Sequence, residues 1–211
     1  MKKFINKGFF IVFEGIEGSG KTTQINYLYE ELQARKFNVI RTREPGGTQN
    51  AETIRDLVLD KNIPPFEKIT ETLLLTAARR EHVKKIIEPA LKNNSIVICD
   101  RFVDSTLAYQ GNGLGVNKDT INTLNNIAIG CTKPDLTVLL DLDPKIGLRR
   151  ASKRAELDKF EEYNQKFHEI IRKSYLDLAS EHPEKYIIID ANKEEIILKN
   201  SIIDLVFSRL V

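Results

Sequence analysis

One segment of the chain has residue types and a spacing that suit polyphosphate chemistry. It reads Gly15-Ile16-Glu17-Gly18-Ser19-Gly20-Lys21-Thr22 and matches G-x-x-x-x-G-K-[ST] at every fixed position. Glycines here let backbone N–H groups turn toward a phosphate, and the N-terminus of the following helix adds partial positive charge. We therefore expect a nucleoside triphosphate site, in which Lys21 bridges the β- and γ-phosphates and the Thr22 hydroxyl binds Mg²⁺.

A second candidate pair, Asp100-Arg101, follows another short apolar run. If that run is a strand parallel to the one before the loop, both strands end at the same edge of the sheet, where Asp100 would order the water around Mg²⁺. The guanidinium fork of Arg101 matches a phosphate bidentately, which suits an acceptor phosphate or the migrating group. The pair indicates phosphoryl transfer without a His or Cys nucleophile. The three histidines, His82, His168 and His182, lack metal-ligand spacing, and we expect them on helix surfaces.

The elements that must position these residues follow from the hydrophobic pattern. Short apolar runs rich in β-branched residues alternate with longer helical patterns. The runs are 9–13, 38–42, 96–99, 136–142 and 186–189, and the helical patterns are 25–32, 67–92, 120–129, 145–154, 161–180 and 194–210. This alternation predicts an α/β fold with a five-stranded parallel sheet, strands buried on both sides and helices on both faces. Together with the phosphate-loop motif, it indicates a fold of the P-loop NTPase type. No Pro/Gly/Ser linker interrupts it, so we expect one domain over residues 1–211.

Composition excludes several classes of protein. Lys and Arg total 32 against 30 for Asp and Glu, and the formal net charge of +2 provides no global field for gripping nucleic acid. No apolar stretch approaches the ~18 residues of a membrane span. Cys99 lies in an apolar run, where we expect a buried, reduced thiol. We therefore expect a cytoplasmic protein that binds neither nucleic acid nor membrane.

A GTPase switch is the first alternative to a kinase. Thr132-Lys133-Pro134-Asp135 is similar to the guanine-reading [NT]-K-x-D element, but it precedes a predicted strand where that element follows one, and the chain contains no D-x-x-G. The phosphate loop alone leaves two further alternatives open, namely a kinase for another nucleotide or deoxynucleoside and a non-enzymatic NTP-binding protein.

The chain resembles the thymidylate kinases of bacteria over almost its whole length. The matching blocks are Phe13-Glu14-Gly15 through Thr23, Thr42-Arg43-Glu44-Pro45-Gly46-Gly47-Thr48, Ala77-Ala78-Arg79-Arg80-Glu81-His82, Asp100-Arg101-Phe102-Val103-Asp104-Ser105-Thr106-Leu107-Ala108-Tyr109-Gln110-Gly111 and Pro134-Asp135-Leu136-Thr137. The resemblance implies transfer of the γ-phosphoryl group of ATP to dTMP, giving dTDP and ADP, for dTTP biosynthesis. It also implies Mg²⁺ as the metal and a homodimer.

The resemblance assigns residues to the two substrates. For ATP it implies Gly15, Ile16, Glu17, Gly18, Ser19, Gly20, Lys21, Thr22 and Thr23, and for the metal Thr22 and Asp100. For dTMP it implies Glu17, Glu44, Arg55, Leu75, Arg79, Arg101, Ser105, Thr106, Tyr109 and Gln110. In this assignment Glu17 accepts from the deoxyribose 3′-hydroxyl, and Arg79 and Arg101 flank the phosphate or the thymine carbonyls.

Leu75 departs from the family pattern, which usually has a phenylalanine that stacks on thymine at this position. Base stacking on an aromatic ring is worth roughly 1–3 kcal/mol. We therefore expect weaker or less selective base binding than in relatives that have phenylalanine.

The segment at about 145–160 is predicted to form a short lid. Bacterial thymidylate kinases close the arginines of this region over ATP, and this chain offers Arg149, Arg150 and Arg154. Eukaryotic-type relatives have an arginine in the phosphate loop where this chain has Gly18, so the missing charge must come from the lid. Arg154 is the first candidate, with Arg149 and Arg150 as alternatives, and the expected catalytic residues are Lys21, Arg101 and Arg154.

Overall fold

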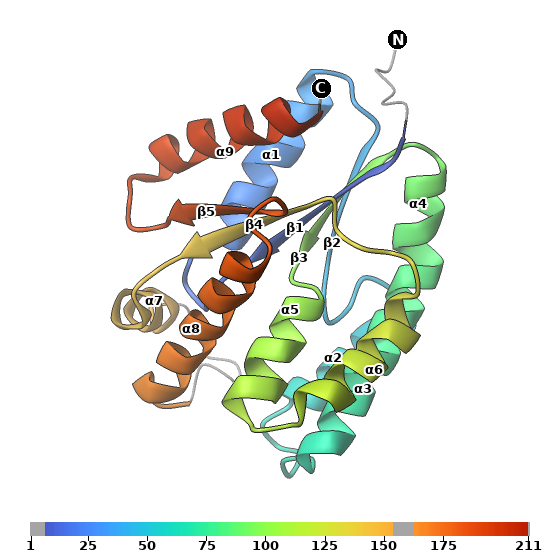
Figure 1. Cartoon of the computed structure of the whole chain (residues 1–211), viewed down its shortest axis with the longest axis vertical. Coiled ribbons are helices and arrows are strands. Elements are labelled where there is room, and N and C mark those ends of the chain that lie inside the picture. The colour runs from blue at the N-terminus through green and yellow to red at the C-terminus, as the bar shows by residue number, and fades with distance from the viewer. Residues whose placement is uncertain (1–6, 154–162, 211) are drawn as a thin grey trace.

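A computed structural model describes residues 7–153 and 163–210 and shows one five-stranded sheet in the order β2-β3-β1-β4-β5 (Figure 1). All neighbouring strands in it are parallel. The strands are β1 (Phe9–Glu14), β2 (Val39–Arg43), β3 (Ile96–Asp100), β4 (Leu136–Asp141) and β5 (Tyr186–Asp190). The predicted α/β fold and the five strands are confirmed, each to within two residues at either end.

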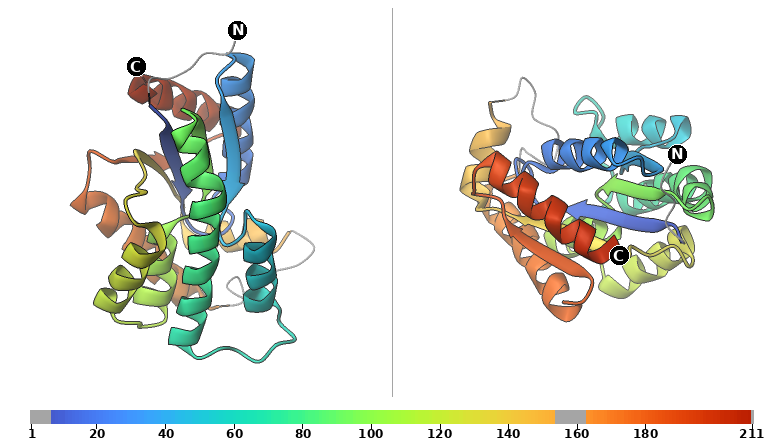
Figure 2. Two further views of the ribbon diagram at one scale, coloured as in Figure 1. Left: turned by 90° about the vertical axis from the view of Figure 1, so that its right-hand side faces the viewer. Right: turned by 90° about the horizontal axis from the view of Figure 1, so that it is seen from above.

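Helices lie on both sides of this sheet, as Figure 2 shows from two further directions. They are α1 (Lys21–Ala34), α2 (Gln49–Leu59), α3 (Lys68–His82), α4 (Glu88–Lys92), α5 (Val103–Thr106), α6 (Lys118–Ile129), α7 (Pro144–Ala151), α8 (Gln165–Glu181) and α9 (Glu195–Leu210). Two π-helical segments, η1 (Val83–Ile87) and η2 (Leu107–Gly113), continue α3 into α4 and extend α5. The described residues contain no helix long and apolar enough to cross a membrane.

Burial differs between the central and the edge strands. The central strands β1, β3 and β4 are buried over nearly their whole length, whereas β2 and β5 alternate between buried and more exposed residues. The prediction that every strand is buried on both sides is therefore wrong for the two edges. In β5, for example, Ile188 is 51% exposed, whereas its neighbours Ile187 and Ile189 are buried.

The sequence pattern missed two helical regions, α2 and the run from α5 through η2. The Thr48 side chain caps α2 by accepting from the Ala51 N–H at 3.2 Å. A threonine is a common N-cap residue, so the sequence does contain a signal for the start of α2. The run from α5 through η2 contains Gly111 and Gly113 and has no regular apolar period. Its helical form depends on packing against the rest of the protein, in which Ala108 and Tyr109 are buried.

Candidate active site

The phosphate loop has the predicted strand–loop–helix context. β1 ends at Glu14 and α1 begins at Lys21, so the loop 15–20 lies at the carboxyl edge of the sheet. The Lys21 ammonium donates to Gly15 O at 2.8 Å, to Ile16 O at 3.0 Å and to Ser19 Oγ at 3.5 Å. Burial, followed by the nearby Arg101 charge, lowers the pKa of Lys21 to about 8. Burial and Arg101 thus disfavour the charged form of Lys21, and a bound phosphate would offset this effect because it brings negative charge to the buried cation.

The two predicted metal residues meet across this edge. Thr22 Oγ1 donates to Asp100 Oδ2 at 3.2 Å, and Asp100 Oδ1 is buried without a hydrogen-bond partner in the described part of the chain. A buried, unpaired carboxylate oxygen beside a hydroxyl fits the oxygen-rich, partly hydrated coordination of a divalent cation. Residues 7–153 and 163–210 hold no group of three His, Cys, Asp or Glu side chains that would form a full protein cage. The donor set therefore suits a metal that takes most of its ligands from phosphate and water.

Arg101 has a strained backbone that places its side chain above the sheet edge. Its φ is 69°, in the left-handed region that non-glycine residues rarely adopt. The Arg101 N–H donates to Phe13 O at 2.9 Å, and the next N–H, of Phe102, donates to Glu14 Oε1 at 2.8 Å. The end of β1 thus holds the turn that presents Arg101, directly before the phosphate loop.

A hydrogen-bonded chain fixes the guanidinium of Arg101. When Glu14 is ionised, Ser105 Oγ donates its one hydrogen to Glu14 Oε2 at 2.7 Å, so the Tyr175 hydroxyl donates to Ser105 Oγ at 2.8 Å. The Tyr175 oxygen then accepts from Arg101 Nη1 at 3.1 Å. Burial and the neighbouring Asp104 raise the pKa of Glu14 to about 7, against the opposing effect of Arg101. The chain therefore links the cation of Arg101 to a carboxyl group that titrates near neutrality.

Glu17 receives three side chains from different elements. Its Oε1 accepts from Arg101 Nη2 at 2.8 Å and from the Tyr109 hydroxyl at 2.5 Å. Its Oε2 lies 3.4 Å from His168 Nδ1 on α8. Burial alone would raise the pKa of Glu17, but Arg101, His168, Lys21 and Tyr109 outweigh it and hold that pKa far below its usual value. The group is an ionised acceptor at the boundary between the loop and Arg101.

Arg79 lies in a buried cluster behind Arg101. It donates to Glu44 Oε2 at 2.6 Å, to Thr106 Oγ1 and Asn125 Oδ1 at 2.8 Å each, and to Phe102 O at 3.0 Å. Burial raises the pKa of Glu44, but Arg79 and His82 outweigh it and lower that pKa below its usual value. Four of the five N–H donors of Arg79 are thus used within the described residues. These contacts hold the guanidinium rigidly, and its fifth N–H can donate to a ligand.

Two of the three histidines are not on helix surfaces, so that prediction is wrong for them. His82 is fully buried between Glu44 Oε1, 3.0 Å from Nδ1, and Thr42 Oγ1, 2.6 Å from Nε2. His168 is 1% exposed, whereas His182 is exposed at the end of α8. The helical pattern places both buried residues on inward faces, where polar partners from distant segments replace water.

The other residues assigned to dTMP surround the same cluster. Gln110 Nε2 donates to the buried Glu71 at 3.1 Å, and Arg55 Nη1 donates to Pro45 O at 2.8 Å. Leu75 is buried on α3, one turn before Arg79. Thus the structure gathers β2, α2, α3, α5 and η2 around one region beside Arg101.

Part of the predicted lid is described. Asp143 caps α7 by accepting from the Lys145 N–H at 2.8 Å, and Pro144 stands in its first turn, as the sequence pattern indicates. Arg149 and Arg150 are exposed on this helix, and Arg150 Nη1 donates to Ala191 O at 3.2 Å. Arg154 lies outside the described residues.

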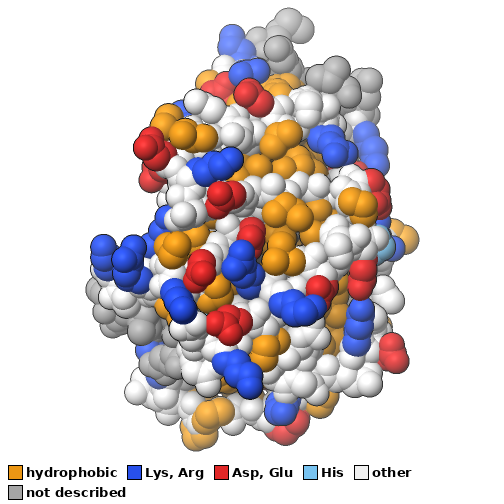
Figure 3. Space-filling view, turned by 60° about the vertical axis from the view of Figure 1, so that its left-hand side comes forward, with side chains coloured by type: hydrophobic (Ala, Val, Ile, Leu, Met, Phe, Trp, Pro, Cys, Tyr) orange, Lys and Arg blue, Asp and Glu red, His pale blue; other side chains and the backbone are white. Residues whose placement is uncertain are grey.

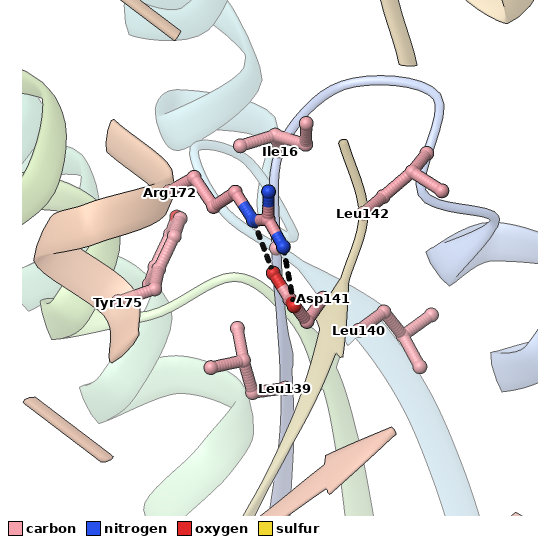
Figure 4. A pocket seen from close by; sticks show the side chains of 8 residues that line it. Ile16, Leu139, Leu140, Asp141, Leu142, Arg172 and Tyr175 are labelled. Carbon is pink, nitrogen blue, oxygen red and sulfur yellow. Dashed lines mark hydrogen bonds and ion pairs between the residues drawn. The ribbon is translucent and has the colours of Figure 1, made fainter. Parts of the chain in front are cut away.

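Three of the residues that sequence reasoning missed lie on one helix, α8. His168, Arg172 and Tyr175 are spaced by four and then three positions, so they share a face. Arg172 binds Asp141 bidentately at 2.7 and 2.8 Å, beside Ile16 of the phosphate loop and one turn from Tyr175 (Figure 4). Three polar-tipped side chains on the buried face of an amphipathic helix are the signal that could have identified α8.

Comparison with known proteins gives one consistent result. The family model described as "Thymidylate kinase" matches residues 13–202. The chain is 47% identical to the thymidylate kinase of Pelobacter propionicus, with 88% of this chain and 87% of that protein covered. It is 43% identical to the thymidylate kinase of Caulobacter vibrioides, with 98% and 99% covered. Among solved structures, that of thymidylate kinase from Ehrlichia chaffeensis matches with a TM-score of 0.77 at 36% identity, over 95% of this chain and 99% of that one.

Proposed function

Since this chain belongs to the thymidylate kinase family, it is an enzyme that phosphorylates dTMP for dTTP synthesis, and we propose that it does so through the residues described above. In this proposal the phosphate loop and Lys21 bind ATP, Arg101 binds the phosphate of dTMP, and the products are dTDP and ADP. One observation carries it: Arg101 is held in a strained turn next to Glu17 of the phosphate loop, so a phosphate bound by Arg101 would lie beside one bound in the loop.

The residues need only align and neutralise the two substrates. A phosphate monoester has a second pKa near 6, so the acceptor is mostly dianionic at neutral pH and needs no general base. Lys21 and Arg101 reduce the repulsion between the two anions and hold them in line. The hydrogen bonds from Glu14 through Ser105 and Tyr175 hold the guanidinium of Arg101 in one position. A fixed guanidinium orients the substrate phosphate that binds to it.

We propose that the residues around Arg79 and Arg101 also recognise the nucleoside. In this proposal Glu17, whose low pKa keeps it ionised, accepts from the 3′-hydroxyl of the deoxyribose. Arg79 has one N–H donor beyond its four protein contacts for a thymine carbonyl, with Leu75 one turn away on the same helix. Glu44 and Thr106 hold Arg79, and in this proposal Arg55, Tyr109 and Gln110 also contact the nucleotide.

A family phosphotransferase of this kind uses a divalent metal, and we propose Mg²⁺. Thr22 and Asp100 would hold it, since their oxygens already meet and one Asp100 oxygen lies buried and unpaired in the described structure. When bound, Mg²⁺ neutralises phosphate charge and orients the transferred group.

We further propose that residues 1–211 form one kinase domain with a lid at about 145–160. In this proposal Arg154 acts as the lid arginine, with Arg149 and Arg150 beside it at the ATP site. The exposed positions of Arg149 and Arg150 on α7 support a role over the nucleotide, because α7 also packs against the phosphate loop. Lid closure would remove water that competes with dTMP as the acceptor.

A cytoplasmic homodimer that binds neither nucleic acid nor membrane is the proposed form of the protein. Exposed apolar side chains on the neighbouring helices α3 and α6, which include Leu73 and Ile127, support self-association. On the face shown in Figure 3, acidic and basic side chains are interspersed with apolar ones, and the net charge is only +2. A surface of this kind does not favour a polyanion.

A panel of nucleoside monophosphates, each incubated with ATP and Mg²⁺ and followed by ADP release, tests the proposal. We expect turnover with dTMP, and Lys21→Ala should lower kcat by roughly a hundredfold or more because it removes a charge that acts on the transferred phosphate. Turnover with another acceptor, or hydrolysis that needs no acceptor, would refute the assignment.

The lid residue is tested separately. Arg154→Ala should lower kcat more than it raises the KM for dTMP, whereas Arg149→Ala and Arg150→Ala serve as matched variants on the same segment. If Arg154→Ala leaves kcat unchanged, the lid charge comes from another residue.

A further inference from the structure

His168 is a buried titratable side chain that the mechanism above does not use. It lies on α8 with 1% of its surface exposed, and its Nδ1 is 3.4 Å from Glu17 Oε2. The neighbouring Phe167 ring packs edge-on against the imidazole at a centroid distance of 5.6 Å. A buried polar ring loses its hydrogen bonds to water, and Nε2 of His168 has no partner among the described residues, so the contact of Nδ1 with Glu17 is the polar contact that can orient the ring.

The two oxygens of Glu17 have different surroundings. Oε1 is held by Arg101 and Tyr109, at 2.8 and 2.5 Å. Oε2 is also buried, yet it has no aligned hydrogen-bond partner among residues 7–153 and 163–210. The separation of 3.4 Å from His168 Nδ1 is longer than a charge-assisted hydrogen bond of about 2.8 Å. Oε2 therefore has lone pairs to spare for a ligand while an imidazole stands beside it.

We propose that His168 is a positioning residue that orients the carboxylate of Glu17 toward the 3′-hydroxyl of the acceptor nucleotide. Nδ1–H approaches one side of Oε2 and restrains the carboxylate plane, which leaves a lone pair of Oε2 for the hydroxyl hydrogen. The preference of the enzyme for acceptors that carry a 3′-hydroxyl then depends on a residue of α8 that touches no substrate. This inference rests on the proposed function, because it takes the dTMP site to lie beside Glu17.

Alternative groups near Glu17 do not fill this role. Arg101 and Tyr109 both approach Oε1, and they come from the loop after β3 and from η2. Only the contact from α8 reaches Oε2 in the described structure. Restraint of the carboxylate at both oxygens therefore requires His168.

The test compares two acceptors, dTMP and 3′-deoxythymidine monophosphate, in three variants of this position. Asn places an amide N–H where Nδ1 lies, Gln places one where Nε2 lies, and Phe removes both. We expect His168→Phe and His168→Gln to lower kcat/KM for dTMP by about tenfold, because a misoriented Glu17 loses its charged hydrogen bond to the 3′-hydroxyl. The 3′-deoxy substrate should change by less than about twofold. His168→Asn should restore most of the preference for dTMP.

His182→Phe, at the exposed histidine that directly follows α8, is the matched control. An equal loss for both acceptors in His168→Phe, or no recovery in His168→Asn, would overturn the proposal, since a purely packing role predicts both. Calorimetric binding of the two monophosphates yields the same preference without turnover. A wild-type protein that binds dTMP but does not phosphorylate it would thus refute the proposed function and still test His168.

Discussion

Gly18 of the phosphate loop and Gly147 of α7 pack backbone against backbone. A side chain on Gly18 would overlap the carbonyl oxygen of Gly147, and a Cβ on Gly147 would lie 2.5 Å from Glu17 O and 3.1 Å from Ile16 Cδ1. Gly18 also has a φ of 70°, which favours glycine. An arginine at position 18 therefore has no space here, which gives a steric reason for supplying that charge from the lid.

Gly147→Ala should impair ATP binding specifically. The added methyl group must push α7 and the phosphate loop apart, and overpacking of this kind costs roughly 1–3 kcal/mol. We expect the KM for ATP to rise by about tenfold, with a much smaller change in the KM for dTMP. Lys145→Ala, at an exposed position of the same helix, is the control. A folded Gly147→Ala enzyme with an unchanged KM for ATP would contradict the coupling.

Tyr175→Phe should reduce the rate of transfer and leave the fold intact. The ring stays in the core, but Arg101 Nη1 and Ser105 Oγ lose the hydroxyl that lies 3.1 and 2.8 Å from them. Because a hydrogen bond to a charged group is worth about 1.5–3 kcal/mol, we expect kcat to fall by about tenfold or more.

The control for Tyr175→Phe is Tyr186→Phe, which removes a hydroxyl that donates to Asp104 at 2.6 Å. It measures the stability cost of losing a phenol group without disturbing Arg101. Equal kcat values for the two variants would show that Tyr175 does not support the arginine.

The raised pKa of Glu14 predicts how stability depends on pH. Its pKa rises from 4.5 to about 7 on folding, so the folded state holds this proton more tightly than the unfolded state. The resulting stabilisation is complete below pH 4.5 and is lost as the pH rises through 7. Across this window the unfolding free energy should fall by up to about 3 kcal/mol from this group alone.

Glu14→Gln isolates that effect. Urea unfolding at pH 5 and pH 8 should show a smaller decrease in the variant than in the wild type. Glu17 acts in the opposite direction in both proteins, because its low pKa stabilises the fold above the usual range of a carboxyl group. Glu169→Gln, at an exposed site of α8, controls for removal of a charge. Equal decreases in wild type and Glu14→Gln would show that Glu14 is not protonated in the fold.

Leu75→Phe tests the departure from the family pattern. A ring at this buried position of α3 should stack on thymine and add part of the roughly 1–3 kcal/mol of an aromatic contact. We expect the KM for dTMP to fall about fivefold and the selectivity over dUMP to change. Leu73→Phe, 48% exposed on the same helix, is the control. Unchanged affinity and selectivity would mean that Leu75 does not face the base.

The phosphate loop and the strands of this protein could be predicted from its sequence, because both depend mainly on local residues. The phosphate loop from Gly15 to Thr22 can be recognised from sequence, because the glycines, the lysine and the hydroxyl that form it are close together in the chain. The central strands β1, β3 and β4 are short, nearly continuous apolar runs, and such runs indicate burial on both faces of a parallel sheet. The same reasoning failed for α2 and for η2, whose helical form depends more on neighbours than on their own pattern.

Tertiary structure alone decided which distant groups support the site. By contrast, the contact between Asp100 and Thr22 could be predicted, because parallel strands end at one edge of the sheet and each of these residues follows a predicted strand. No spacing rule relates Glu14 to Tyr175 through Ser105, or Glu17 to His168, because α8 reaches the sheet edge from far along the chain. Buried polar groups must find partners wherever packing brings them, so their identity follows from the fold and not from the local sequence.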